Sequence, residues 1–288
     1  MLKKAVIPIA GLGTRFLPLS RVVPKELFPL VDKPVIQYIV EEAKLSGIKE
    51  IIFVVRPKKK EILEYFQEDS KLEKLLKKRK RNHLLKELYP IKELVKGISF
   101  SVVSQKEPMG DGHAILQAKK IIKKNPFGVF FADDVVESKI PCLEQLINVF
   151  RTAQAPVIAL KQVSEEKIPS YGIAGVEKIS NRLYKIKKIV EKPEKELAPS
   201  NLAIVGRYVL TAEVFSWLDK ESAPKHKEII LANALRKMIE SGKTIYGYEI
   251  NGRWLECGTK LSWLESNFYL SLKHPTFGER LKKIIKEI

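Results

Sequence analysis

The residues Ala10-Gly-Leu-Gly-Thr-Arg-Phe-Leu-Pro-Leu-Ser-Arg-Val-Val-Pro-Lys-Glu26 follow directly on an apolar run, residues 4–9. Glycine has no Cβ, so a loop of this kind lets successive backbone N–H groups approach a polyanion. In α/β folds, ligands collect at the carboxyl ends of strands. The stretch therefore predicts an α/β protein with a phosphate-binding loop after its first strand.

Two cations and two glycines limit the kind of phosphate site that this loop can form. Arg15 can bind phosphate oxygens through two N–H groups, and Lys25 is a compact point charge, so the two can reach different phosphates. Gly11-Leu-Gly13 alone is weak evidence, because such pairs occur in many tight turns. The loop lacks the rest of G-x-G-x-x-G, and the chain has no G-x-x-x-x-G-K-[ST] motif. Neither a Rossmann dehydrogenase nor a P-loop NTPase is favoured.

Apolar, β-rich runs alternate with helical segments through the first half of the chain. The runs cover residues 4–9, 48–55, 98–103, 128–132 and 156–162, and the helical segments cover residues 34–46, 61–78, 112–124 and 141–153. This alternation predicts a mainly parallel sheet. Shorter β pieces follow at 172–179, 183–190 and 202–210, and helices at 212–218, 228–241, 259–272 and 277–288.

Composition sets the class of protein and its compartment. The chain has 288 residues, of which 45% are hydrophobic, so it can bury a sizeable core. No apolar run approaches the roughly 18 residues that span a bilayer, and we expect a cytoplasmic protein without a membrane segment. Cys142 and Cys257 are too few for a disulfide framework and lack metal-ligand spacing, so both are expected to be reduced thiols.

The net charge of +18 raises the question of a nucleic-acid partner. Residues 71–96 are rich in lysine and arginine, with leucines at intervals that suit an amphipathic helix. Charge runs of this kind commonly form exposed faces, and we favour that interpretation here. Substrate steering, a partner protein and RNA stay open as alternatives for this segment.

Several motifs in order along nearly the whole chain resemble the sugar-1-phosphate nucleotidylyltransferases, and among them the bacterial UTP–glucose-1-phosphate uridylyltransferases. They are GLGTRFLP at 11–18, PKE at 24–26, DKP at 32–34, QKEPMG at 105–110, GHA at 112–114, ADD at 132–134, YG at 171–172, VEKP at 190–193 and APSNLAIVGRY at 198–208. The resemblance implies a single doubly wound, Rossmann-like nucleotidyltransferase domain over residues 1–288. Within it, a nucleotide-binding half (about 1–140) would precede an inserted β sugar-binding half (about 141–258) and a C-terminal helical segment (about 259–288).

The resemblance also implies roles for individual residues. The nucleotide-binding residues would be Ala10, Gly11, Gly13, Glu26, Gln105 and Gly110. Gly172, Glu191 and Lys192 would bind the sugar phosphate, with Glu191 accepting hydrogen bonds from glucose hydroxyls, and Arg15, Lys25 and Lys192 would be catalytic. Gln105 would read the pyrimidine edge with its amide, while His113 is favoured as a structural or nucleotide-positioning residue, because phosphate is already a competent nucleophile. In an extended strand, Glu191 and Lys192 would point in different directions unless Pro193 forces a turn.

Asp133 and Glu256 are the carboxylates that the resemblance assigns to Mg²⁺, with Asp134 as the adjacent competitor of Asp133. By turn preferences alone, this aspartate pair would equally suit a solvated strand end. The family usually has a second aspartate where this chain has Glu256. Asp111 replaces a usually apolar residue beside the base loop, and residues 225–233 differ from the family's glycine-rich GGEIQLTD-like stretch. Sugar specificity is therefore less firmly predicted than the reaction class.

The reaction expected from the resemblance is uridylyl transfer from UTP to α-D-glucose 1-phosphate, which gives UDP-glucose and pyrophosphate without a covalent intermediate. A dTTP-using glucose-1-phosphate thymidylyltransferase is the near alternative. A catalytically impaired regulatory or nucleic-acid-binding relative is the distant one. The expected partners are UTP, glucose 1-phosphate and further copies of the chain in a dimer or tetramer, with neither a specific nucleic acid nor a membrane.

Overall fold

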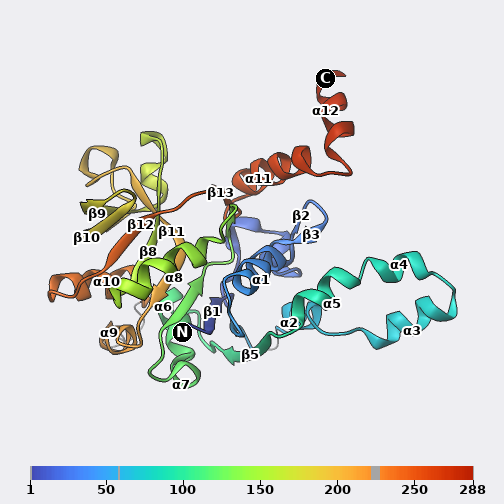
Figure 1. Ribbon diagram of the computed structural model, residues 1–288, viewed down its shortest axis with the longest axis horizontal. Coiled ribbons are helices and arrows are strands. Elements are labelled where there is room, and N and C mark those ends of the chain that lie inside the picture. Colours follow the sequence, from blue (N-terminus) through green and yellow to red (C-terminus); the bar gives the residue numbers. More distant parts are fainter. Residues whose placement is uncertain (1, 58, 222–227, 288) are drawn as a thin grey trace.

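A nine-stranded sheet forms the body of the protein (Figure 1), in a computed structural model that describes residues 2–57, 59–221 and 228–287. Four strands of the first half are parallel neighbours in the order β5-β4-β1-β6, as the alternating pattern predicts. Their bounds are β1 Lys4–Pro8, β4 Glu50–Val55, β5 Ser99–Ser104 and β6 Phe127–Phe130. The sheet continues as β11-β8-β12-β10-β9.

This second part corrects the expectation of a mainly parallel sheet, because the whole sheet is mixed. β11 (Leu202–Leu210) is antiparallel to both of its neighbours, β6 and β8 (Val157–Gln162). β9 (Gly172–Ser180) and β10 (Leu183–Glu191) form a hairpin, whose short connection permits only antiparallel pairing. Only β12 (Tyr246–Glu249) runs parallel to β8.

Helices cover both faces of the sheet, because residues along its strands alternate between two cores. Ala5 and Ile7 of β1 belong to one apolar cluster, and Val6 belongs to the other. The first cluster is closed by α1 (Val35–Leu45) and α8 (Cys142–Ala153). The second cluster is closed by α6 (Asp111–Gln117), α7 (Lys119–Ile122), α9 (Val214–Glu221) and α10 (Leu231–Glu240).

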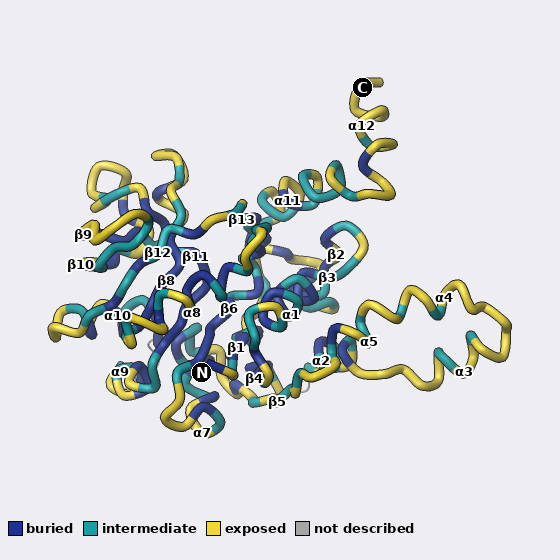
Figure 2. Tube along the Cα trace, viewed as in Figure 1, coloured by how far each residue is buried: buried dark blue, intermediate teal, exposed yellow. Residues whose placement is uncertain are grey.

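The basic segment is helical, as predicted, and it leaves the body as an arm (Figures 1 and 2). The arm comprises α2 (Glu61–Tyr65), α3 (Ser70–Lys78), α4 (Asn82–Lys86) and α5 (Tyr89–Val95). The helix expected over 61–78 is interrupted, because Asp69 accepts hydrogen bonds from the N–H groups of Lys71 and Leu72 and so starts α3.

Two small sheets and two C-terminal helices complete the described fold. β7 (Asp134–Glu137) pairs antiparallel with β13 (Arg253–Glu256), which places Glu256 opposite Asp134. β2 (Pro29–Leu30) pairs with β3 (Lys33–Pro34), and 3₁₀ turns occur at Thr14–Phe16, Leu19–Arg21, Lys25–Leu27, Glu165–Ser170 and Lys195–Leu197. α11 (Lys260–Lys273) and α12 (Gly278–Glu287) end the chain. Among the described helices, none combines the length and the apolar character needed to span a membrane.

Candidate active site

Three strand ends of the first half meet at one cavity of about 350 Å³. The glycine loop follows β1, Gln105 follows β5, and Asp133 lies just beyond β6. Because β1, β5 and β6 point in the same direction across the parallel part of the sheet, their carboxyl ends reach the same edge. The lining includes Ala10, Gly11, Lys25, Glu26, Gln105, Gly110 and Asp133. Gly13 lies beside this cavity, in a recess of about 20 Å³ that also contains Gly11, Lys25 and Glu26.

Two glycines near the first cavity have conformations or neighbours that other residues would not fit. Gly13 has φ of 65° and initiates the 3₁₀ turn that carries Arg15. Gly110 has φ of 95°, and a Cβ at this position would stand 2.5 Å from the carbonyl oxygen of Ile229. The loop that begins at Gln105 is therefore packed tightly against the residues that lead into α10.

Gln105 is buried and its amide nitrogen is fully used inside the protein. Nε2 donates to the carbonyl of Gly110 at 2.9 Å and lies 3.0 Å from Nδ1 of His113. Burial lowers the pKa of His113, which favours a neutral ring whose Nδ1 accepts this hydrogen bond. Within the described chain, Oε1 of Gln105 accepts no hydrogen bond, so this oxygen is available to a donor on a ligand. His113 thus positions Gln105.

The predicted sugar residues lie in a second cavity, of about 230 Å³, whose lining includes Gly172, Glu191 and Lys192 together with Arg15 and Glu256. Lys192 has φ of 45°, in the left-handed region, and its N–H donates to the carbonyl of Tyr171 at 3.0 Å. This turn before Pro193 ends the strand, and it lets Glu191 and Lys192 line the same cavity. Oε2 of Glu191 lies 3.0 Å from the point where a Cβ on Gly172 would stand.

The two cavities adjoin, because Asp111, Phe131 and Asp133 line both of them. Asp111 does not present its charge freely to this boundary. Its Oδ1 accepts from the N–H groups of Gly112 at 2.6 Å and Leu231 at 2.9 Å, and burial raises its pKa. Asp111, which stands where the family usually has an apolar residue, therefore links the start of α6 to the start of α10 by hydrogen bonds. Residues 225–227 of the divergent stretch lie outside the described residues.

Lys25 and Asp133 form an ion pair at the boundary of the cavities, with 2.7 Å between Nζ and Oδ2. Burial alone would lower the pKa of Lys25, but Asp133 and Glu26 outweigh that effect and raise it. Burial would likewise raise the pKa of Asp133, yet the attraction of Lys25 lowers it. Both groups are therefore charged at neutral pH. Glu26 is buried, and its burial raises its pKa.

Asp133 and Glu256 approach each other around Gly258. Oδ2 of Asp133, Oε1 of Glu256 and Nη1 of Arg15 lie 3.2, 3.3 and 3.4 Å from the point that a Cβ on Gly258 would occupy. Within the described residues, no group of three or more His, Cys, Asp or Glu side chains could hold a metal ion. Two carboxylates beside a space for phosphates nonetheless fit Mg²⁺, which commonly takes one or two carboxylates and completes its shell with phosphate oxygens and water.

Two aromatic residues, Tyr171 and Trp254, hold the carboxylates around this point. The Tyr171 hydroxyl donates to Oε2 of Glu256 at 2.8 Å, and the Trp254 indole N–H donates to Oδ1 of Asp134 at 2.6 Å. The two rings pack against each other with centroids 4.7 Å apart. Asp134 also accepts from the N–H of Gly206, so it is committed to the fold. The YG motif was a signal for Tyr171, but no local pattern indicates its contact with Glu256.

Comparisons with known proteins agree with one another. The nucleotidyl transferase family model matches residues 4–271. A UTP–glucose-1-phosphate uridylyltransferase of Staphylococcus haemolyticus (strain JCSC1435) is 40% identical over 287 residues, which cover 100% of this chain and 98% of that protein. A UTP-bound UGPase from Acinetobacter baumannii is 38% identical, with a TM-score of 0.91 and 100% of both chains covered.

A solved UDP-glucose pyrophosphorylase in complex with UDP-glucose is 36% identical, with a TM-score of 0.85, and the match covers 95% of this chain and 100% of that chain. The chain belongs to the nucleotidyl transferase family and, within it, to the UTP–glucose-1-phosphate uridylyltransferases.

Proposed function

We propose that this protein transfers a uridylyl group from UTP to α-D-glucose 1-phosphate, giving UDP-glucose and pyrophosphate. The observation that carries the proposal is the pair of adjoining cavities, which share Asp111, Phe131 and Asp133 as a common wall. A nucleotide bound beside Gln105 and a sugar phosphate bound beside Lys192 would meet at this wall. Relatives that are 36 to 40% identical over nearly the whole chain carry the same reaction in their names.

The chemistry needs alignment and positive charge rather than a protein nucleophile. A phosphate oxygen of glucose 1-phosphate attacks the α-phosphorus of UTP in line, and the bond from that phosphorus to the β-phosphate oxygen breaks as pyrophosphate leaves. Arg15, Lys25 and Lys192 would hold the two anions and stabilise charge on the phosphoryl oxygens. Burial raises the pKa of the Cys257 thiol to about 12, so this residue stays protonated and takes no part as a nucleophile.

Asp133 and Glu256 would hold Mg²⁺, which when bound neutralises charge on the phosphate oxygens of the nucleotide. Lys25 is paired with Asp133. Asp133 would be one of the residues that hold the metal, and Lys25 would then bind a phosphate group in place of this carboxylate. Arg15 lies 3.4 Å from the same point beside Gly258, lines the second cavity and would face the sugar phosphate. The residues expected around the phosphates are therefore the Lys25–Asp133 ion pair, the carboxylate of Glu256 and the cation of Arg15.

Gln105 accounts for the choice of base. Its amide nitrogen is held by Gly110 and His113, so it can only accept, through Oε1, from a donor on the base. Uracil and thymine carry an N–H at the middle of the pairing edge, whereas cytosine carries an acceptor there. We therefore expect rejection of CTP to be strong. Rejection of dTTP should be weaker, because its base differs from uracil by one methyl group only, although its sugar also lacks the 2′-hydroxyl.

A pyrophosphate-release panel tests the proposal. UTP, dTTP, CTP, ATP and GTP are each paired with glucose, galactose and N-acetylglucosamine 1-phosphates, with and without Mg²⁺. We expect the highest kcat/KM for UTP with glucose 1-phosphate and Mg²⁺. A higher value for dTTP would identify a thymidylyltransferase, and binding of RNA without any pyrophosphate release would support the regulatory alternative. Homo-oligomer formation and a cytoplasmic location stay predictions.

A further inference from the structure

Asp111 stands at the wall that the two cavities share, and one of its two carboxylate oxygens is left without a partner among the described residues. Oδ1 accepts from the N–H groups of Gly112 and Leu231. Oδ2 accepts no hydrogen bond from any described residue, yet it is not fully buried. It is therefore an acceptor that a ligand in the cavities can reach.

The backbone around Asp111 fixes the position of this oxygen. The N–H of Gly112 donates to the carbonyl of Ile229 at 2.9 Å, and the N–H of Ile229 donates to the carbonyl of Met109 at 2.8 Å. The residue is thus held both by this backbone pairing and by the two hydrogen bonds that Oδ1 accepts. A hydrogen bond from a ligand to Oδ2 would cost little conformational entropy, because the side chain is already ordered.

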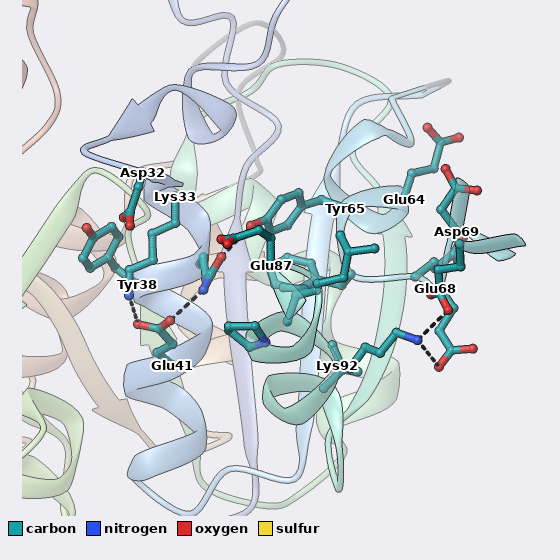
Figure 3. Close-up of a pocket in the computed structure, with 18 of the residues that line it drawn as sticks. Asp32, Lys33, Tyr38, Glu41, Glu64, Tyr65, Glu68, Asp69, Glu87 and Lys92 are labelled. Carbon is teal, nitrogen blue, oxygen red and sulfur yellow. Dashed lines mark hydrogen bonds and ion pairs between the residues drawn. The ribbon is translucent and has the colours of Figure 1, made fainter. Parts of the chain in front are cut away.

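Asp111 also lacks a cation as partner, in contrast to carboxylates in another cavity of the chain. That cavity, of about 560 Å³, lies between the arm and α1 (Figure 3), and in it Lys33 pairs with Glu41. In the same cavity, Lys92 pairs with Glu73. Asp111 makes no ion pair with any described residue, although it lines a site for polyanions. A carboxylate repels a phosphate group, so a ligand group that contacts Oδ2 has to be a neutral donor.

The order of the groups in UTP would bring the ribose to Asp111. The ribose links the base to the α-phosphate, and the proposed function has the base beside Gln105 and the phosphates beside Lys25 and Asp133. Asp111 follows Gly110 of the base loop and shares a wall with Asp133, so it borders both positions. The ribose is the part of the nucleotide that spans them, and its 2′- and 3′-hydroxyls are neutral donors.

We propose that Oδ2 of Asp111 accepts a hydrogen bond from a ribose hydroxyl of UTP, and that this contact contributes to the choice of nucleotide. The inference rests on the proposed function, from which it takes the positions of the base and the phosphates. The apolar residue that the family usually has at this position could not accept such a hydrogen bond. A nucleotide without the contacted hydroxyl would leave the carboxylate oxygen without a donor, and it would therefore bind less tightly.

Two substitutions at Asp111 and two nucleotide analogues test the contact. Asp111→Asn keeps an oxygen for the N–H groups of Gly112 and Leu231 but has an amide NH₂ in place of Oδ2. Asp111→Leu removes both oxygens. Isothermal titration calorimetry gives the dissociation constants of UTP, 2′-deoxy-UTP and 3′-deoxy-UTP, with Mg²⁺ and without a sugar phosphate. Circular dichroism checks that each variant is folded, and Asp111→Asn decides alone if Asp111→Leu does not fold.

We expect the wild type to bind one of the two analogues about tenfold or more weakly than UTP, because a hydrogen bond to a charged group is lost. In Asp111→Asn this preference for UTP should fall to about threefold, since the amide offers only a neutral hydrogen bond. In Asp111→Leu the two dissociation constants should agree within about twofold, because no hydrogen bond is left to lose.

Glu228→Gln is the matched control. Glu228 also lines the first cavity, makes no ion pair with any described residue and loses its charge by the same isosteric change, so this variant should keep the wild-type preference. A preference that shrinks in the Asp111 variants and persists in Glu228→Gln supports the contact, and the analogue concerned identifies the hydroxyl.

Three results would overturn the contact. They are a wild type without the preference, an Asp111 variant that is folded and keeps the full preference, and an equal loss of preference in Glu228→Gln. The dissociation constants do not depend on turnover. Pyrophosphate release without the preference would refute only this inference, and the preference without pyrophosphate release would refute only the proposed function.

Discussion

Two ion pairs within the body differ in how completely their charges are satisfied. Arg207 is 0% exposed, and three of its nitrogen-to-oxygen contacts reach Glu42, which also accepts from the N–H of Leu143. Lys25 and Asp133 make one contact with each other, and their side chains are 22% and 27% exposed in the walls of the cavities. The first pair has no capacity left for a ligand, whereas the second can exchange partners.

The two pairs are also connected through the backbone. Nη1 of Arg207 donates to the carbonyl of Phe131 at 3.0 Å, two residues before Asp133. The Arg207–Glu42 pair therefore holds the end of the strand that carries Asp133, which belongs to the Lys25–Asp133 pair. A buried ion pair whose hydrogen bonds are all made stabilises the fold. An ion pair that borders a cavity and still has unused hydrogen-bonding groups can bind a ligand.

Replacing Lys25 by alanine should have the largest effect, and it should fall on turnover rather than on stability. We expect kcat/KM to fall by about 10³-fold, or about 4 kcal/mol of transition-state stabilisation, because a cation is lost where phosphoryl charge develops. Steady-state pyrophosphate release and thermal unfolding measure the two effects. If the variant kept wild-type turnover, Lys25 would have no role in catalysis.

Replacing Glu42 by glutamine should instead reduce stability more than turnover. The change leaves the charge of Arg207 buried without its partner, and we expect the free energy of unfolding to fall by about 3 kcal/mol. Urea denaturation measures the loss. The double variant Glu42→Leu with Arg207→Met removes both charges and should be more stable than the single variant. Equal stability of Glu42→Gln and wild type would contradict the claim that the Arg207–Glu42 pair stabilises the fold.

The exchange of partners at Asp133 can be measured without nucleotide. Lys25→Met frees the carboxylate and removes a repelling cation, so Mn²⁺, which replaces Mg²⁺ in this assay, should bind about thirtyfold more tightly, or about 2 kcal/mol. Electron paramagnetic resonance reports free Mn²⁺ directly. Lys192→Met is the matched control, since Lys192 makes no ion pair with Asp133 in the described chain. Unchanged or weaker Mn²⁺ binding by the Lys25 variant would contradict the exchange.

Local order in the sequence explains why the residues predicted to bind nucleotide lie close together. Gln105 and Asp133 follow apolar runs, and parallel strands bring such positions to one edge of a sheet. All the residues expected to bind nucleotide, sugar phosphate or metal line one of the cavities at this edge. Their roles stay predictions until they are tested.

Long-range pairing explains what the sequence did not indicate. The direction of β11 is set by its neighbours β6 and β8, which lie far away along the chain, and so the mixed sheet was not predicted. β7 and β13 have four residues each and carry polar ends, so neither forms a recognisable apolar run. The Tyr171–Glu256 hydrogen bond joins residues 85 positions apart. Such contacts follow from packing and not from periodicity.

The smallest of the expected effects concerns Tyr171, which would position Glu256 rather than touch substrate. Tyr171→Phe removes the hydrogen bond to Oε2, so Glu256 is less well held toward Asp133, and we expect about tenfold weaker Mn²⁺ binding in the presence of UTP. Tyr184→Phe is the matched control, because it removes a tyrosine–glutamate hydrogen bond on the far part of the sheet.

A double-mutant cycle shows whether Tyr171 acts through Glu256. In Glu256→Asp the carboxylate is one methylene shorter and is withdrawn from the tyrosine hydroxyl, so adding Tyr171→Phe should weaken Mn²⁺ binding little further. Independent, additive losses would mean that Tyr171 supports the cavity by packing on Trp254 instead. A strong coupling would mean that Tyr171 holds Glu256, the glutamate that stands where the family usually has an aspartate. The same hydrogen bond would then affect both metal binding and the second cavity, which Tyr171 and Glu256 both line.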